Sequence, residues 1–266
     1  MNHKFIDLSL PLENSKSEPE PVVIDYVTHR EGACILTKNT GLSPDSFVDG
    51  LAVNLERIRL TSHSGTHVDA PLHYGPISQN QKSKSIDEMP LHLFFGQALM
   101  LDCSGSEAKE TVQPDEIEDA LESQQLSIVP GDIVLIHTGA DKLWGSAEYF
   151  TDFRGISLEA TEKLLDFGVK VIGVDCFGFD APFQKMIDAY KKTHDQSVLW
   201  PCHMIGRKRE YCQIERLTNL SLLPRESKFL LSCFPIKLKG CGAGPSRVVA
   251  IIENHFPKQT LSGVIL

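Results

Sequence analysis

The sequence has no long apolar run. Over its 266 residues, no stretch approaches the roughly 20 consecutive apolar residues that a membrane-spanning helix needs. The first residues, Met1 to Phe5, do not lead into the apolar core of a signal peptide. Both absences predict a protein that stays in the cytoplasm and does not insert into a membrane.

Paired cysteine motifs are missing as well. The seven cysteines are odd in number, are scattered along the chain and never occur as Cys-x-x-Cys. A disulfide framework normally uses an even number of cysteines at regular spacings. We therefore expect reduced thiols, which agrees with a cytoplasmic protein.

An excess of positive charge is the third absence. The chain has 26 Lys and Arg against 35 Asp and Glu, a formal net charge of −9. A general nucleic-acid binder needs a basic face, so we expect a small-molecule partner and no nucleic acid. No repeat, low-complexity tract or linker divides the sequence, and we predict one domain over residues 1–266.

Local patterns predict an α/β domain with a mixed β-sheet. Pro114 suits a first helical residue, and Ser157 and Gly168 suit the start and end of a second helix. Residues 133–136 are continuously apolar, as in a strand covered on both faces, and we expect residues 169–174 to form another buried strand. We expect residues 28–49 to form a loop and 240–245 a turn. Further strands are predicted at residues 5–8, 22–27, 55–62, 98–103, 228–233 and 247–253.

The most informative stretch is residues 63–73, His-Ser-Gly-Thr-His-Val-Asp-Ala-Pro-Leu-His. It places His63, His67, Asp69 and His73 within eleven residues, and imidazole and carboxylate groups are the usual ligands of zinc and manganese. A helix would point Asp69 away from the first two histidines. On an extended chain the even spacing puts all four side chains on one side, and this pattern predicts a metal site.

The motif His63-x-Gly65-Thr66-His67-x-Asp69-x-Pro71-x-His73 resembles the signature of the cyclase-like metal hydrolases, a family that includes arylformamidases and isatin hydrolases. The resemblance extends from residue 7 to the predicted strand at 247–251. It implies a swivelling β/β/α fold, a dimer or larger homo-oligomer, and a metal-dependent hydrolase acting on C–N bonds other than peptide bonds.

The resemblance also implies roles for particular residues. His63, His67 and Asp69 would hold one divalent metal, most simply Zn²⁺ with Mn²⁺ as the alternative. A His and a Glu twelve residues apart are typical of the binuclear formamidases, and His203 and Glu215 have this separation. Asp69 would then bridge two metals. His73 would be the catalytic proton donor and acceptor.

Simpler roles compete for the residues in the second half of the chain. His203 could be a surface histidine, and Glu215 could pair with Arg216 or Arg207. His194 is expected to be solvated. Asp175 and Asp180 follow a predicted buried strand, and we expect them to support the site or the fold rather than to react.

The substrate class stays open at this stage. The formamidases carry a tryptophan in an N-terminal substrate loop, whereas Trp144 and Trp200 lie elsewhere. Isatin hydrolases typically have Gln at the position of Glu215. The sequence therefore predicts an amidase for a formamide or a cyclic amide of a small, aromatic substrate. A lactone hydrolase and a non-catalytic metal or small-ligand binding protein are the alternatives.

Overall fold

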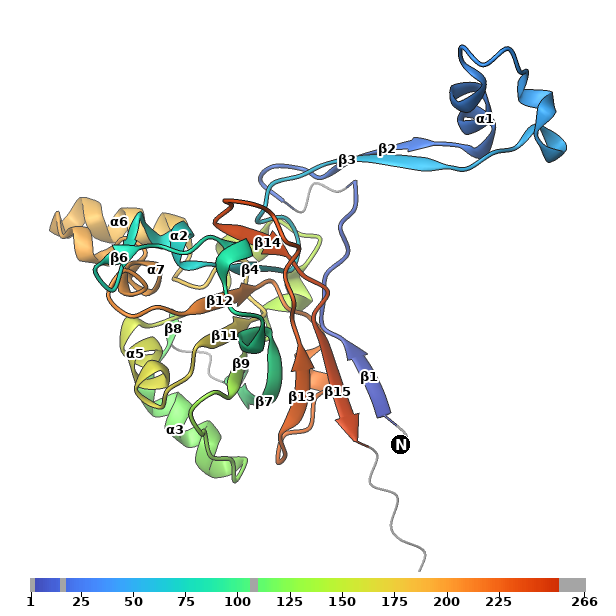
Figure 1. Ribbon diagram of the computed structural model, residues 1–266. Helices are drawn as coiled ribbons and strands as arrows, with labels where there is room; N and C mark the ends of the chain where they lie inside the picture. Colours follow the sequence, from blue (N-terminus) through green and yellow to red (C-terminus); the bar gives the residue numbers. More distant parts are fainter. Residues whose placement is uncertain (1–2, 15–17, 106–109, 254–266) are drawn as a thin grey trace, which may run out of the picture.

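The strand Ile133–His137 (β9) is buried along its whole length, as expected for a continuously apolar strand. It lies in the middle of a mixed nine-stranded sheet in the computed structural model of the protein, which describes residues 3–14, 18–105 and 110–253 (Figure 1). The order of the strands is β1 (His3–Asp7), β15 (Val249–Glu253), β13 (Phe229–Ser232), β7 (Phe95–Asp102), β9, β11 (Val171–Val174), β12 (Cys212–Glu215), β4 (His67–Asp69) and β14 (Ala243–Pro245).

The four central strands β7, β9, β11 and β12 run parallel, and the flanking strands pair antiparallel. In a parallel group, the carboxyl ends of all strands meet at one edge of the sheet. Ligands commonly bind at this edge in α/β proteins. The connections between these parallel strands contain helices, as parallel pairing requires.

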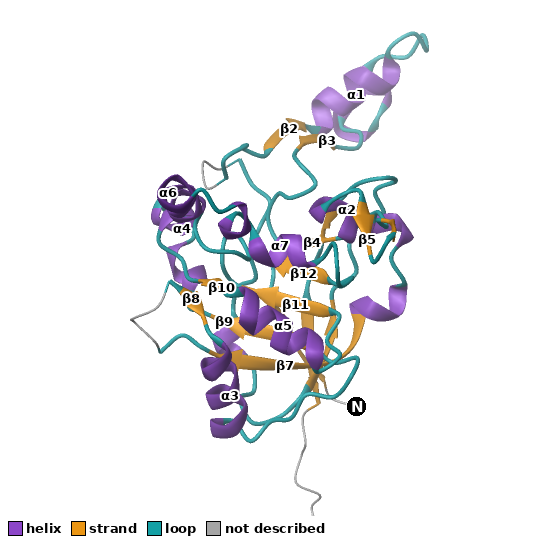
Figure 2. Cartoon of the chain, turned by 90° about the vertical axis from the view of Figure 1, so that its left-hand side faces the viewer, coloured by secondary structure: helices purple, strands orange, loops and turns teal. Residues whose placement is uncertain are grey.

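The helices of the body are α2 (Pro71–Tyr74), α3 (Pro114–Ser123), α4 (Glu148–Thr151), α5 (Leu158–Asp166), α6 (Phe183–Thr193) and α7 (Pro201–Ile205). Residues of α3, α5 and α7 cover one face of the sheet, where they form a core with the alternate strand residues Val134 and Ile136 (Figure 2). None of the helices in the described residues is long and apolar enough to span a membrane.

The opposite face of the sheet closes over a second core. Ile133 and Leu135 of β9 point into it, together with Ile6 from β1 and Val68 from β4. Because β1 and β4 lie near opposite ends of the strand order, their shared core requires the sheet to curl. This arrangement confirms the predicted α/β domain with a mixed sheet, although residues 254–266 of the predicted domain lie outside the described residues.

Most local predictions are confirmed. Pro114 is the first residue of α3, and the Ser157 side chain accepts a hydrogen bond from the backbone N–H of Ala160 at the start of α5. Gly168 follows α5 with φ = +85°, a backbone conformation that glycine adopts without strain. Two further strand pairs are short: β5 (Ile77–Ser78) with β6 (Gln81–Lys82), and β8 (Thr111–Val112) with β10 (Gly155–Ile156).

An arm projects from the body (Figures 1 and 2). It consists of the hairpin of β2 (Val23–Val27) and β3 (Leu55–Arg59), with α1 (His29–Thr37) and two short 3₁₀ turns between the strands. The predicted strand before the metal motif therefore exists as β3, but it pairs within the arm and not with the main sheet.

Two predictions about loops are wrong. Residues 28–49 contain the helix α1, whose start is stabilised by reciprocal hydrogen bonds between Thr28 and Glu31. This Thr-x-x-Glu pattern is a known signal for a helix start, although it lies within a polar segment whose composition favours a loop. In the expected turn at 240–245, residues 243–245 form the edge strand β14, where Pro245 is tolerated because an edge position does not need its N–H.

Candidate metal centre

The strand β4 carries the middle of the metal motif. His67 and Asp69 are alternate residues of this strand, so their side chains point to the same side, and both are fully buried. The strand pairs on one side with β12, where Glu215 lies directly opposite His67, and on the other side with β14. The curled sheet thus brings Glu215, far away in sequence, next to the motif.

The two ends of the motif are not extended. His63 lies in a turn where Gly65 has φ = +60°, and a Cβ at this glycine would lie 2.7 Å from the side chain of Leu12. His73 lies on the short helix α2, which begins at Pro71. The expected single extended face is therefore correct for His67 and Asp69 and wrong for the two outer histidines, although all four side chains still converge.

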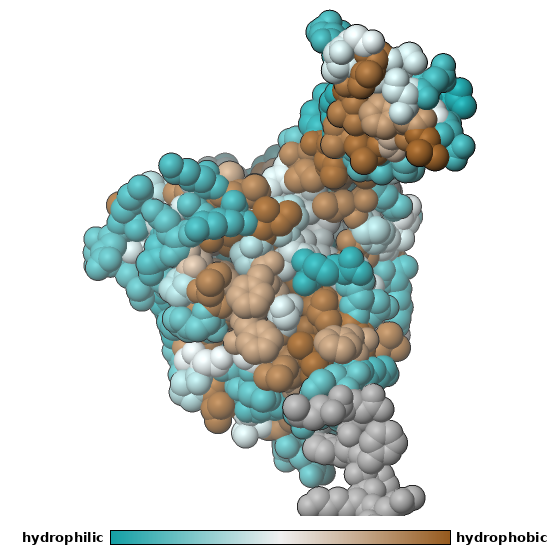
Figure 3. All heavy atoms as spheres, turned by 45° about the vertical axis from the view of Figure 1, so that its right-hand side comes forward, coloured by the Kyte–Doolittle hydropathy of each residue, from teal (hydrophilic) through white to brown (hydrophobic). Residues whose placement is uncertain are grey.

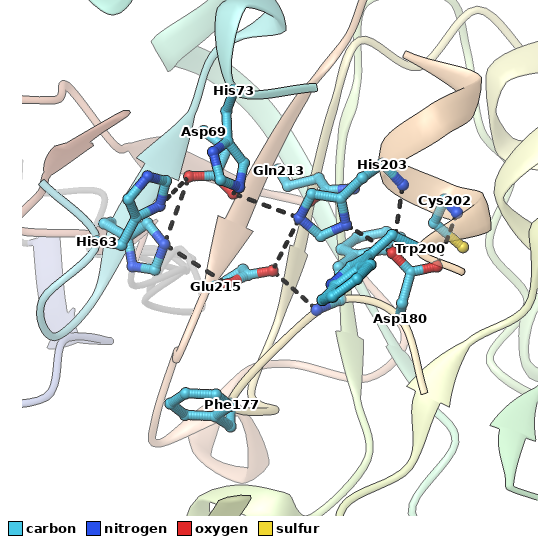
Figure 4. A network of polar contacts seen from close by, with 12 residues as sticks. His63, Asp69, His73, Phe177, Asp180, Trp200, Cys202, His203, Gln213 and Glu215 are labelled. Atoms are coloured by element: carbon cyan, nitrogen blue, oxygen red, sulfur yellow. Dashed lines mark hydrogen bonds and ion pairs between the residues drawn. The ribbon is translucent and has the colours of Figure 1, made fainter. Parts of the chain in front are cut away.

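Asp69 is at the centre of the converging groups (Figure 4). Its Oδ1 lies 3.0 Å from His63 Nδ1 and 3.4 Å from His67 Nε2, and its Oδ2 lies 4.0 Å from His73 Nε2 and 3.9 Å from His203 Nε2. The two oxygens thus face two separate groups of nitrogens, which is the geometry needed for a carboxylate that bridges two cations.

Glu215 completes the cluster from β12. Its Oε2 lies 3.5 Å from His67 Nε2, and its Oε1 lies 3.8 Å from His203 Nε2 and accepts a hydrogen bond from the backbone N–H of Phe179 at 2.8 Å. The structure therefore brings together all six predicted site residues, and Glu215 and His203 are both buried.

Asp180 fixes the orientation of His203. One of its carboxylate oxygens accepts a hydrogen bond from Cys202 N at 2.7 Å, and the other lies 2.5 Å from His203 Nδ1 and accepts from His203 N. With the Nδ1 proton held by Asp180, His203 Nε2 faces the cluster. A carboxylate behind a histidine is the usual support for a metal-binding imidazole. The expectation that Asp180 supports the site agrees with this position.

The charges of the cluster shift the pKa values of its members in opposite directions. Burial raises the pKa of Glu215 to about 7, and the neighbouring charge of Asp69 adds to the shift. Burial tends to raise the pKa of Asp69, whereas the surrounding histidines tend to lower it. The effect of the histidines is larger, so the pKa of Asp69 is lowered. Burial opposes protonation of His203, but the bond and charge of Asp180 outweigh it and raise its pKa to about 9.

The motif histidines differ from one another. Burial lowers the pKa of His67 to about 3 and that of His73 to about 4. For His63 burial also acts downward, but the negatively charged Asp69 carboxylate, 3.0 Å away, outweighs it and raises the pKa. His67 and His73 are consequently neutral at pH 7, with a nitrogen lone pair free to bind a cation or to accept a proton.

Unpartnered buried atoms indicate that a cation fits here. His67 Nε2 and both carboxylate oxygens of Asp69 are buried without a hydrogen-bond partner. His67 Nδ1 lies 2.8 Å from the carbonyl oxygen of Gly65 and donates its proton there, which leaves Nε2 with a lone pair. Burying a nitrogen lone pair next to a carboxylate destabilises the folded state unless a positive charge lies between them.

A cavity of about 360 Å³ opens beside the cluster. His63, His73 and His203 line it together with apolar and aromatic residues, among them Phe177, Phe183, Met186 and Trp200. Phe183 and Trp200 stack with their ring centroids 5.1 Å apart. A cavity of this size suits a small ligand.

Of the apolar and aromatic residues that line the cavity, Phe177, Phe183, Met186 and Trp200 are called the aromatic wall here. The sequence did not predict this wall. Its residues come from α6, from the loop after β11 and from the residue before α7, and no periodic pattern joins these segments. Trp200 carries one usable signal, because it directly precedes Pro201 and the predicted ligand His203. It also has a positive φ of 50°, a strained conformation that is common at functional sites.

The structure distinguishes between the alternative roles of Glu215 and His194. Glu215 is buried rather than in a surface ion pair. Arg207 donates instead to the carbonyl oxygen of Tyr74, and Arg216 forms an ion pair with Glu18 and lies over the ring of Phe177 at 4.2 Å. His194 is exposed at the end of α6, as expected for a solvated histidine.

Solved structures share this fold. An isatin hydrolase bound to the product analogue thioisatinate superposes with a TM-score of 0.71 at 21% identity, over 94% of this chain and 92% of that one. Isatin hydrolase A from Ralstonia solanacearum gives a TM-score of 0.72 at 22% identity, over 94% and 92% of the two chains. This agreement confirms the expected swivelling β/β/α type.

Sequence comparison leads to the same group of proteins. The kynurenine formamidase of Maricaulis maris (strain MCS10) is 28% identical over 199 residues, which are 74% of this chain and 80% of that protein. Residues 6–181 match the model of the family described as putative cyclase. Since this match spans more than half of the chain and includes the whole histidine motif, the protein belongs to the putative cyclase family.

Proposed function

We propose that this protein is a metal-dependent hydrolase that cleaves the amide C–N bond of a small aromatic formamide or cyclic amide. The observation that carries the proposal is the set of buried, unpartnered ligand atoms on His67 and Asp69, which lie beside an aromatic cavity lined by His73. The similarity to a kynurenine formamidase and to isatin hydrolases supports the same bond type.

His63, His67 and Asp69 would hold one divalent cation, and Asp69, His203 and Glu215 a second one. This assignment is supported by the way Asp69 presents one oxygen to His63 and His67 and the other to His203. Bound metal would supply an activated water and polarise the substrate carbonyl. We propose Zn²⁺ as the metal, with Mn²⁺ as the alternative, because both accept imidazole and carboxylate ligands.

His73 would move the proton during hydrolysis. Its side chain is about one third exposed, at 36%, on the cavity side of the cluster, and its lowered pKa keeps it neutral at pH 7. It would take the proton released as the water oxygen bonds to the carbonyl carbon. As the C–N bond breaks, it would deliver that proton to the leaving nitrogen.

The aromatic wall would bind the ring of the substrate. Phe177, Phe183 and Trp200 line the same cavity as His63, His73 and His203, and aromatic rings pack favourably against one another. A flat aromatic amide could place its ring against this wall and its carbonyl toward Asp69 and Glu215.

Hydrolysis of three compounds tests the proposal: a formanilide, an isatin-like ring amide and an aromatic lactone. We expect cleavage of at least one amide, loss of activity with a chelator, and recovery on adding Zn²⁺ or Mn²⁺. Cleavage of the lactone alone would contradict the amidase assignment. Metal binding without turnover of any of the three compounds would favour a non-catalytic binding protein.

A cytoplasmic location is proposed on the basis of the cysteines. All seven are free thiols, and five of them are buried in the two cores. An oxidising compartment would favour their pairing. Localisation of the tagged protein by cell fractionation tests this assignment.

We also propose that the protein forms a homo-oligomer through its arm. The arm exposes apolar side chains, including Val48 at 84% exposure, and Figure 3 shows apolar residues, among polar ones, on both the arm and the face of the body below it. A hollow of about 640 Å³ lined by Leu10, Pro11, Phe234 and Ile236 lies on the body. Patches of this kind mark interaction sites. Light scattering should give a dimer or tetramer, and Val48→Ser should shift it toward monomer.

A further inference from the structure

A second cluster of ligand-type side chains lies at the carboxyl ends of the parallel strands. Asp102 ends β7, His137 ends β9, Asp175 directly follows β11, and Asp141 lies in the 3₁₀ turn after β9. One ligand atom from each of His137, Asp141 and Asp175 lies within 4.8 Å of the other two. None of these residues lines the cavity beside the histidine motif.

His137 presents a free lone pair to this cluster. Its Nδ1 lies 3.1 Å from Asp102 Oδ1 and donates to it, so that the other ring nitrogen, Nε2, is unprotonated in the neutral side chain. The His137 side chain is only 4% exposed, Nε2 has no hydrogen-bond partner, and it lies 3.9 Å from Asp175 Oδ2. Asp102 thus plays for His137 the part that Asp180 plays for His203.

Arg225 forms an ion pair with Asp102 at the edge of the cluster, but the carboxylates of Asp141 and Asp175 have no such cationic neighbour among the described residues. Thr138 and Gly139 hold the Asp175 carboxylate in place with hydrogen bonds of 2.7 to 2.9 Å. Burial raises the pKa of Asp175, although the hydrogen bonds from Thr138 act the other way.

We propose that His137, Asp141 and Asp175 bind a divalent cation at a site separate from the histidine motif. The separation of 3.9 Å between His137 Nε2 and Asp175 Oδ2 is less than twice the usual bond length of about 2.0–2.2 Å, so that one ion reaches both atoms. One nitrogen and two carboxylate oxygens suit zinc or manganese.

This cation would connect the ends of two central strands to the turn that follows β9. Asp141 also accepts hydrogen bonds from Thr218 and Asn219, which follow β12 and the ligand Glu215. A bound ion would therefore stabilise the folded state and tie the segment behind Glu215 to the sheet edge.

Metal content of the full-length protein tests the inference. Stripped protein is equilibrated with Zn²⁺, passed through a desalting column and analysed for metal per chain. The variants are His137→Gln and Asp141→Asn, with the exposed His92→Gln as the matched control. We expect each cluster variant to hold one ion fewer than the control. The Asp69→Asn background removes the bridging ligand of the motif site and should retain the ion at the cluster, whereas Asp69→Asn combined with His137→Gln should retain none.

The outcomes separate this inference from the proposed function. Equal metal content in Asp69→Asn with and without His137→Gln would overturn the cluster site, whatever the motif site does. Loss of one ion in His137→Gln and Asp141→Asn would support it even if no amide were hydrolysed. Circular dichroism and the melting temperature identify any variant that fails to fold. Asp141→Asn is the safer variant because Asp141 is only partly buried.

Discussion

The bond between Asp180 and His203 leads to a quantitative prediction for the variant Asp180→Asn. The carboxylate accepts the Nδ1 proton of His203 at 2.5 Å and also two backbone N–H groups of α7. Asparagine keeps the size but has a single acceptor oxygen. If this oxygen remains with the backbone of α7, the NH₂ group faces His203 Nδ1 and favours the tautomer that is protonated on Nε2. That tautomer has no lone pair on Nε2, the nitrogen that faces the cluster.

The expected loss follows from the role of such supporting carboxylates. Their removal typically weakens metal affinity by about 10- to 100-fold, which corresponds to about 1.4–2.8 kcal/mol. Only the ion held by His203 and Glu215 should be affected, because Asp180 has no hydrogen bond to His63 or His67.

Competition with a chromophoric chelator measures the two affinities in wild type and variant. Asp188→Asn is a matched control on the neighbouring helix α6, where this aspartate is exposed and accepts a hydrogen bond from Gln184. We expect the control to behave as wild type, while Asp180→Asn retains one tight site and weakens the other. Two unchanged affinities in Asp180→Asn would refute the reasoning that its carboxylate sets the tautomer of His203.

Three further predictions concern the proton, the metal uptake and the core. His73→Ala should keep its metal content and lose most amide hydrolysis; parallel loss of metal would identify His73 as a ligand. In the metal-free protein, His203 with a pKa of about 9 and Glu215 with a pKa of about 7 carry protons that metal must displace. The affinity for metal should therefore rise about tenfold per pH unit between pH 7 and 9, and more steeply below pH 7. A metal affinity that does not change with pH, measured by chelator competition, would contradict this prediction. Leu135→Ala, at a fully buried position, should lower the free energy of unfolding in urea by about 2–5 kcal/mol, whereas Leu91→Ala at an exposed position should change it little.

The sequence was sufficient where local chemistry determines the outcome. The apolar run at residues 133–136 and the mainly apolar segment at 169–174 contain central strands, because only a doubly covered strand can bury every side chain. The histidine motif predicted a metal site, and its members do converge. The separation of His203 and Glu215, carried over from the family resemblance, correctly placed both residues in the same cluster.

Tertiary placement could not be read from the sequence. The even spacing of the four motif residues predicted that they lie on one face of an extended segment. In the structure, however, a turn positions His63 and the short helix α2 positions His73 next to Asp69. The aromatic wall joins segments without a common pattern. The arm exposes apolar residues that a sequence argument would assign to a core. These features depend on contacts between distant segments, which local propensity does not describe.

The position of β4 between β12 and β14 also has a consequence for the order of folding. The metal-motif strand near residue 67 makes its ladder hydrogen bonds with strands at residues 212–215 and 243–245. During synthesis from the N-terminus, β4 cannot form its strand pairs until nearly the whole chain has been made. Contacts of such long sequence separation slow folding, and the exposed motif could meanwhile capture metal in a non-native arrangement. We therefore expect refolding in the presence of a chelator, with metal added afterwards, to give a higher yield of native protein than refolding with metal present from the start.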